Sequence, residues 1–258
     1  MAGVRSFLTS ALCLMPSALL ASFRTLTTLV LLSLYILILA PPVLAWTALS
    51  RDPRVLYLAG NGGVRLALAL AGLRVRVMGA EHIQQNRAAV YAANHNSNID
   101  PPAVFAAMSA LHPRVRTVYK AELRRLPLLV WVFDAAGFVA VERANREQSL
   151  PALDGATRSL AAGNSFFIFP EGTRSRTGEL LPFKKGGFLM AIAAQVPVVP
   201  VAVSGGREAM RKGSPIIWPA TVTVQFCTPI PTAGMTADDR DVLIAKVRAA
   251  IEERLPGA

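Results

Sequence analysis

The sequence predicts an α/β domain preceded by an apolar helical anchor, on the strength of three observations. From about residue 64 onward, short apolar runs typical of buried strands alternate with helical segments. Polar clusters directly follow several of these runs, which is where open α/β sheets place their sites. The first 50 residues hold only two charged side chains, Arg5 and Arg24. We therefore expect a membrane-anchoring helical segment over residues 1–50 and an α/β domain over residues 64–258.

The anchor contains no charged residue between positions 25 and 50. Its most apolar part, Thr25–Ala40, is 16 residues long, slightly short of the roughly 20 that a straight span needs. Pro41 and Pro42 follow, and we expect them to break or kink the helix. Two interpretations stay open: a helical hairpin that dips into one leaflet, which the prolines favour, and one true span. A cleaved signal peptide is disfavoured, because no small-x-small cleavage site follows a short apolar core.

The chain is strongly basic, with a net charge of +11, and nucleic acid and anionic membrane are the usual partners of such chains. The basic residues are scattered with few aromatic residues between them, so we expect membrane lipid and no nucleic acid as a partner. We place the protein at the inner (cytoplasmic) membrane with its site facing the cytoplasm. The arginines close to the apolar segments suit such a surface: Arg5, Arg24, Arg51, Arg54, Arg65, Arg74 and Arg76.

Metal binding and disulfide formation are not expected from this sequence. The two cysteines, Cys13 and Cys227, form no disulfide framework and have no metal-ligand spacing. The three histidines are dispersed, and two of them, His82 and His112, are predicted to be surface loop residues.

The expected elements of the domain follow a hinge at Asn61-Gly62-Gly63. A capping box, Thr236-x-x-Asp239, opens the final helix. The strand over 196–203 is expected to be interrupted by Pro197 and Pro200. Strands are expected over 74–78, 88–93, 115–119, 137–141, 165–169, 196–203 and 221–226, and helices over 64–73, 100–110, 147–162 and within 184–194.

The polar cluster that follows the strand at 88–93 contains His95 and Asp100, five residues apart. A tight turn can bring an Asp100 oxygen to one imidazole nitrogen, which fixes the tautomer and leaves the other nitrogen as a general base. No serine or cysteine stands nearby in a nucleophile-elbow pattern, so the pair suggests activation of a substrate hydroxyl. Alternatively, Asp100 only caps the next helix, with Pro101 at its first position, and His95 only completes a turn.

A second cluster, Phe169-Pro-Glu-Gly-Thr-Arg-Ser175, also follows a buried strand. Gly172 permits a tight backbone, Thr173 and Ser175 carry hydroxyl groups, and Arg174 carries a forked cation, which together suit an anion. Lys120 and Glu142-Arg143 end two further strands. In a parallel sheet these ends converge with His95 and describe a site for a phosphorylated substrate. Each of these charges, taken alone, is equally explained as a solvated surface group.

Four ordered motifs make the chain resemble the glycerolipid acyltransferase family, in particular the 1-acylglycerol-3-phosphate acyltransferases. They are Asn-His-x-x-x-x-Asp at 94–100, the Gly137–Arg143 strand, Phe-Pro-Glu-Gly-Thr-Arg-Ser at 169–175 and Val-Pro-x-x-Pro-Val at 196–201. Their order and spacing agree over residues 90–201. One departure is Glu142, where aspartate is commoner in the family. The resemblance implies a mixed sheet flanked by helices.

The resemblance also implies a role for each site residue. His95 removes the proton from the free sn-2 hydroxyl of 1-acylglycerol-3-phosphate, the oxygen attacks an acyl thioester, Asp100 orients His95, and phosphatidic acid forms. No metal and no bound cofactor is implied, since acyl-CoA or an acyl carrier protein is a co-substrate. The implied binding residues are Lys120, Arg143 and Arg174 for the acceptor phosphate, Glu171, Gly172 and Thr173 around it, and Val196, Pro197 and Pro200 on the acyl side.

Three alternatives remain open at this point. The acceptor could be another lysolipid, such as a lyso-ornithine lipid or a lysophospholipid. The chain could be a hydrolase, with water in place of the acceptor. It could also be a membrane-binding protein without activity, although the intact His95–Asp100 pair argues against this.

Overall fold

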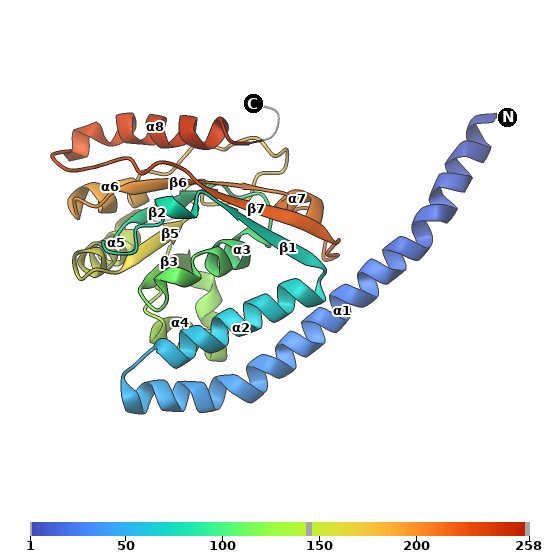
Figure 1. Cartoon of the computed structure of the whole chain (residues 1–258), viewed down its shortest axis with the longest axis horizontal. Coiled ribbons are helices and arrows are strands. Elements are labelled where there is room, and N and C mark those ends of the chain that lie inside the picture. Colours follow the sequence, from blue (N-terminus) through green and yellow to red (C-terminus); the bar gives the residue numbers. More distant parts are fainter. Residues whose placement is uncertain (1, 143–145, 256–258) are drawn as a thin grey trace.

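The computed structural model of the chain describes residues 2–142 and 146–255. It shows a twisted sheet between two layers of helices, with the long helix α1 along the outside of one layer (Figure 1). Four 3₁₀ turns, η1–η4, join some of the elements. The helices are α1 (Ala2–Ser50), α2 (Arg54–Leu70), α3 (Asp100–Ala107), α4 (Pro127–Ala135), α5 (Arg146–Ala161), α6 (Gly186–Ala193), α7 (Gly206–Ala209) and α8 (Arg240–Glu252). The strands are β1 (Leu73–Met78), β2 (Val90–Ala93), β3 (Val115–Lys120), β4 (Val139–Val141), β5 (Ser165–Ile168), β6 (Val198–Ser204) and β7 (Ala220–Phe226).

The seven strands form one mixed sheet in the order β1-β7-β6-β2-β5-β3-β4. The run from β6 to β4 is parallel throughout, whereas β7 pairs antiparallel with β6 and parallel with β1. The carboxyl ends of β6, β2, β5, β3 and β4 therefore all lie at one edge of the sheet. This edge is where ligands bind in open α/β folds.

Side chains alternate across the sheet, and each face has its own core. Tyr91 and Ala93 of β2 belong to the core under α2 and α3, whereas Val90 and Ala92 belong to the core under α5, α6 and α8. All four are fully buried. Burial on both faces explains why the sequence shows continuous apolar runs here rather than alternation.

Helix α1 continues through Pro41 and Pro42, so of the expected break or kink the break is wrong. The chain reverses instead at residues 51–53, and α2 returns along α1 (Figure 1). The segment Ser17–Ser50 is long and apolar enough to cross a membrane, by length and composition alone. Most of its large apolar side chains face outward, among them Leu19, Leu20, Phe23, Leu26, Leu37 and Ile38.

The expected hinge at Asn61-Gly62-Gly63 is also wrong, because these residues lie inside α2. Here the glycines permit a close approach between helices. A Cβ at Gly63 would be 2.8 Å from Tyr35 Cε1 of α1, and the Tyr35 hydroxyl donates a hydrogen bond to Ala59 O at 2.8 Å. Packing against α1 thus offsets the low helix propensity of glycine.

Two further expectations are corrected by the structure. Strand β6 begins after Pro197 and continues through Pro200 without interruption. Pro200 is tolerated because the β6–β7 ladder begins one residue later, at Val201. His112 is not a surface loop residue, since its ring packs 4.4 Å from that of Phe105. The capping box at Thr236 is present, and it opens η4 (Ala237–Asp239) directly before α8.

Candidate active site

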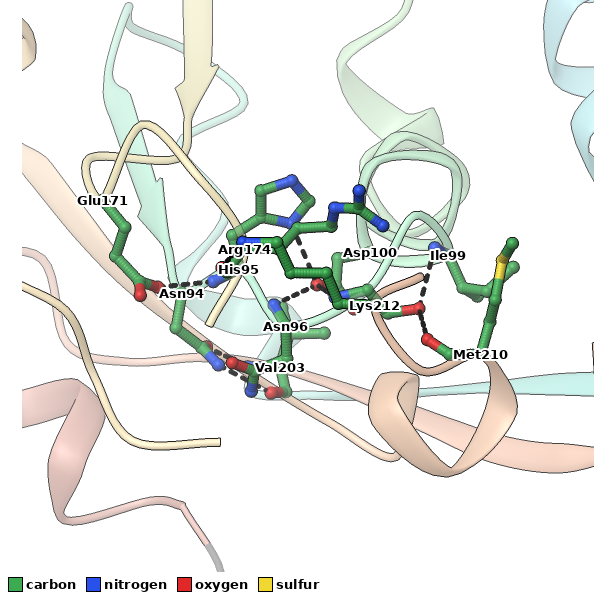
Figure 2. A network of polar contacts seen from close by, with 11 residues as sticks. Asn94, His95, Asn96, Ile99, Asp100, Glu171, Arg174, Val203, Met210 and Lys212 are labelled. Carbon is green, nitrogen blue, oxygen red and sulfur yellow. Dashed lines mark hydrogen bonds and ion pairs between the residues drawn. The ribbon is translucent and has the colours of Figure 1, made fainter. Parts of the chain in front are cut away.

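The His95–Asp100 pair forms as the sequence predicts. His95 Nδ1 lies 3.0 Å from Asp100 Oδ2 (Figure 2). The Asp100 side chain is fully buried, and 13% of the His95 side chain is exposed. Its ring stacks on Phe169, with the ring centroids 4.4 Å apart. With Nδ1 facing the carboxylate, Nε2 is the nitrogen left to exchange a proton with a substrate.

Asp100 does not cap α3. Its carboxylate turns back toward the preceding loop, where Oδ2 accepts hydrogen bonds from the amides of Asn96, at 2.6 Å, and Ser97, at 2.7 Å. The residue preceding the helix is Ile99, without a side-chain cap, and Asp100 itself is the first helical residue. The amides of the turn thus fix the carboxylate that orients His95. The catalytic interpretation of Asp100 agrees with this geometry, whereas the capping interpretation is wrong.

Two hydrogen bonds attach the loop at 169–175 to the backbone of His95. Glu171 Oε1 accepts a hydrogen bond from the His95 amide at 2.6 Å, and the Ser175 amide donates to His95 O at 2.8 Å. Arg174 lies between these two contacts in the sequence. The loop therefore places its guanidinium group beside the His95–Asp100 pair (Figure 2).

Glu171 has a structural part in this arrangement. Its second oxygen, Oε2, accepts from the Leu181 amide at 3.0 Å, and the residue is only 3% exposed. Burial raises the pKa of Glu171, and the amides of Leu181 and His95 offset part of this effect. Both carboxylate oxygens thus accept hydrogen bonds from backbone amides, and Glu171 shapes the site by joining two loops.

Asn94 fixes the other side of the catalytic turn. Its side-chain amide donates to Val203 O at 2.9 Å, and its Oδ1 accepts from Val203 N at 2.7 Å. This double contact continues the pairing of β2 with β6 beyond the end of β2. The segment after β6 also contributes, since the Ser97 hydroxyl donates to Met210 O at 2.8 Å.

Gly206, the first residue of α7, lies directly against the Asp100 carboxylate. A Cβ at this position would come within 3.0 Å of Asp100 Oδ1, so no other residue fits without movement. Gly172 is required for a different reason, because its φ is +68° and the stem of Lys184 lies against its Cα. Sequence analysis found Gly172 in its motif but missed Gly206, whose role depends on packing between segments far apart in the chain.

Two lysines missed by sequence analysis lie at the 169–175 loop. Lys212 Nζ donates to Arg174 O at 2.7 Å, and the Lys184 side chain covers Gly172. Lys184 could have been suspected from its place nine residues after the Phe169–Ser175 motif. Lys212 had no motif to point to it.

Lys120, another predicted cation, lies further along the same edge. Lys120 ends β3, two strands from β2, and pairs with Glu122 at 2.8 Å. At about 4.8 Å per strand, this places it roughly 10 Å sideways from the end of β2. Arg143 lies outside the described residues. Thr173 is exposed, and its Oγ1 lies 3.4 Å from Lys212 Nζ.

The motif at 196–201 lies in the core of the sheet. Pro197 O accepts from the Val90 amide at 3.0 Å, Val196 O accepts from the Thr232 hydroxyl at 2.8 Å, and Pro200 is paired with Ala92. Val196, Pro197 and Pro200 do not line the large apolar cavity described next.

An apolar cavity of about 730 Å³ lies between α1, α2, α3 and α4. Its walls are aliphatic over nearly their whole extent, with Leu32, Leu39 and Val43 on α1 and Leu56 and Leu68 on α2. At one end it reaches the catalytic turn, because Ile99 and Pro102, on either side of Asp100, also line it. The cavity thus lies between the outward-facing apolar helix and the residues that flank Asp100.

This fold is shared with known proteins. The acyltransferase family matches residues 74–204, and the chain belongs to that family. The 1-acyl-sn-glycerol-3-phosphate acyltransferase of Limnanthes douglasii is 32% identical over 194 residues, which cover 75% of this chain and 67% of the relative. The beta enzyme of that name from Homo sapiens is 34% identical over 174 residues, which cover 67% of this chain and 62% of the relative.

A solved structure extends the likeness to nearly the whole chain. The crystal structure of the 1-acyl-sn-glycerophosphate (LPA) acyltransferase PlsC from Thermotoga maritima superposes with a TM-score of 0.77 at 26% identity. The match covers 93% of this chain and 99% of that one. The resemblance to 1-acylglycerol-3-phosphate acyltransferases, and the mixed sheet that it implies, are therefore confirmed.

Proposed function

We propose that this protein transfers a fatty acyl group from an acyl thioester to the sn-2 hydroxyl of 1-acylglycerol-3-phosphate, with phosphatidic acid as the product. The observation that carries the proposal is the attachment of the Arg174 loop to His95 itself, which sets a cation beside an oriented general base. Relatives that bear this activity in their names support the same acceptor.

The chemistry needs one base and no nucleophile from the protein. His95 Nε2 takes the proton of the acceptor hydroxyl as its oxygen attacks the thioester carbonyl. Asp100 stabilises the imidazolium that forms. The tetrahedral intermediate then expels the thiolate, and the imidazolium returns its proton to the sulfur. The ester, the free thiol and a neutral histidine result, so that all atoms and charges balance.

We assign the acceptor phosphate to Arg174, with Lys120 further along the edge; the assignment of Arg143 to the phosphate stays a prediction from the family resemblance. A guanidinium group suits phosphate because its fork matches two oxygens. The apolar cavity between α1 and α4 is of the size that holds ligands, and we assign an acyl chain to it. Such a chain could enter from the bilayer, because α1 forms one wall.

The apolar helix α1 supports attachment to a membrane, with the catalytic domain on the cytoplasmic side. Its outward-facing leucines would be costly to expose to water, and arginines lie within it at position 24 and directly after it at positions 51 and 54. The protein should accordingly stay with membranes through an alkaline carbonate wash. Release into the wash would contradict insertion of α1.

The test of the activity is a matched panel of donors and acceptors with the purified full chain in mixed micelles. Labelled acyl-CoA and acyl carrier protein are each supplied with 1-acylglycerol-3-phosphate, lyso-ornithine lipid, a lysophospholipid or no acceptor. We expect labelled phosphatidic acid as the main product. If another lysolipid yields more labelled product than 1-acylglycerol-3-phosphate does, that lysolipid is the acceptor. Labelled free fatty acid at the same rate with and without an acceptor would identify a hydrolase.

A further inference from the structure

Lys212 occupies a place in the site that no motif marks. It lies on the loop after α7, partly buried, and its ammonium group donates to Arg174 O at 2.7 Å (Figure 2). A second, longer contact of 3.4 Å runs to Thr173 Oγ1. We propose that Lys212 is a positioning residue of the acceptor site, which holds Arg174 in place through its carbonyl oxygen and adds a second fixed positive charge for the acceptor phosphate. This inference rests on the proposed function.

The charge of Lys212 suits an anion site. An ammonium group has three N–H donors, and the two contacts with the loop use at most two of them. Within residues 17–142 and 151–255, whose side chains the structure describes, neither Lys212 nor Arg174 forms a salt bridge with a carboxylate. Because the Lys212 ammonium contacts the backbone of Arg174, two cationic residues belong to one small region of the site, and this favours an anion there. Phosphate, with two charges and several acceptor oxygens, suits such a pair.

The loop that carries Lys212 is held by hydrogen bonds at both ends, at one end to the catalytic turn and at the other to α1. At one end, Met210 O accepts the hydrogen bond of Ser97, next to the amide that holds Asp100. At the other end, the Ile217 amide donates to Thr25 Oγ1 of α1 at 2.9 Å. Lys212 therefore stands on a bridge between the catalytic turn and the apolar helix, rather than on a free surface loop.

Arg207, on the segment that leads to Lys212, makes a similar contact. Arg207 of α7 donates to Thr177 O, so that the segment 206–212 contacts the 173–177 loop at two points. Each contact is from a cation to a backbone carbonyl, which fixes the loop without neutralising the cation. If Lys212 only held the loop in place, its positive charge would not affect phosphate binding, and this can be measured.

Three variants of Lys212 test whether its positive charge is used. Lys212→Met keeps the aliphatic stem and removes the ammonium, and Lys212→Gln is a second neutral variant should the first one fail to fold. Lys212→Arg keeps the charge. Lys246→Met is the matched control, because Lys246 is exposed on α8 and its loss changes the net charge of the protein equally.

The full-length variants are assayed in micelles with 1-acylglycerol-3-phosphate and with a monoacylglycerol that lacks the phosphate. For Lys212→Met we expect the KM for the phosphate-bearing acceptor to rise about tenfold, the size of one charge-assisted hydrogen bond. The KM for the thioester and the rate with monoacylglycerol should change little, and Lys212→Arg should recover most of the loss. Equal losses with both acceptors, or the same loss in Lys246→Met, would overturn the proposal.

A binding measurement keeps this inference separate from the proposed function. Inorganic phosphate should raise the melting temperature of the wild-type protein and of Lys246→Met, and it should do so less for Lys212→Met and Lys212→Gln. This result would stand even if the acceptor proved to be a different phosphate-bearing lipid. Equal stabilisation of all the variants by phosphate would remove Lys212 from the anion site.

Discussion

Replacement of Gly206 by alanine is a small change that should impair catalysis through Asp100. The new Cβ would lie about 1 Å closer to Asp100 Oδ1 than the 3.0 Å below which real Cβ atoms do not go, and 3.1 Å from Ser97 Cβ. Asp100 cannot simply rotate away, because its other oxygen holds His95 and two amides. Either the carboxylate or α7 must move by roughly 1 Å.

A shift of this size would stretch the 3.0 Å contact between His95 Nδ1 and Asp100 Oδ2 to about 4 Å, beyond hydrogen-bonding distance. A misplacement of about 1 Å in a catalytic group can cost about 10²-fold, so we expect kcat to fall by about that factor. Overpacking of the site should also cost about 1–3 kcal/mol of unfolding free energy, which a melting curve would show as a fall of several degrees.

The assay is turnover at saturating donor and acceptor, at a temperature well below the melting transition of the variant. Gly155→Ala is the matched control, because a Cβ there meets only Arg158 Nη2, at 4.0 Å. It lies inside α5 and should be neutral or slightly stabilising. If Gly206→Ala keeps turnover within about threefold of wild type while folded, the close packing of α7 on Asp100 does not position the base, and the argument fails.

Two further predictions concern protonation. Asp100→Asn should leave a folded protein with a severe loss of kcat, because an amide facing Nδ1 favours the wrong imidazole tautomer; the same exchange in a Ser–His–Asp triad costs about 10⁴-fold. Turnover near wild type would show that the charge of Asp100 is not used. The pKa of His112 is lowered from the ordinary 6.5 to about 4, chiefly by burial; a backbone hydrogen bond with Phe105 raises it in part, and nearby Arg65 makes a smaller lowering contribution. Between pH 6.5 and 4 the unfolded chain therefore binds a proton that the folded chain does not, so stability should fall as the pH falls through this window. His112→Phe should flatten this part of the melting temperature–pH curve, and an unchanged slope would show that other groups cause it.

The sequence was sufficient for the parts of the site that are local. His95 and Asp100 are five residues apart in one turn, so their contact depends on a few backbone angles and not on the rest of the fold. The convergence of strand ends followed from alternating strands and helices, because parallel strands share an edge. The role of Asp100 was harder to assign, since an aspartate before Pro-Pro fits a helix cap and an orienting carboxylate equally well. The amides of Asn96 and Ser97 decide between the two.

The parts that could not be predicted depend on packing between distant segments. Gly206 and Lys212 lie more than 100 residues beyond His95 and reach the site only because β6 pairs with β2. The glycines of α2 look like a hinge in the sequence, and only the insertion of Tyr35 against Gly63 shows why a helix tolerates them. The continuous course of α1 through its two prolines likewise depends on neighbours, since α2 and α4 pack along it.

The most direct test of the account is the turnover of His95→Ala with labelled acyl thioester and 1-acylglycerol-3-phosphate. His95 supplies the base of the proposed reaction, and loss of a general base costs about 10²–10⁴-fold. We expect labelled phosphatidic acid to fall by at least about 10²-fold, while the melting temperature and membrane attachment stay near wild type. A folded His95→Ala protein that keeps more than about a tenth of wild-type turnover would contradict the assignment of His95 as the base, and with it the mechanism built on this site.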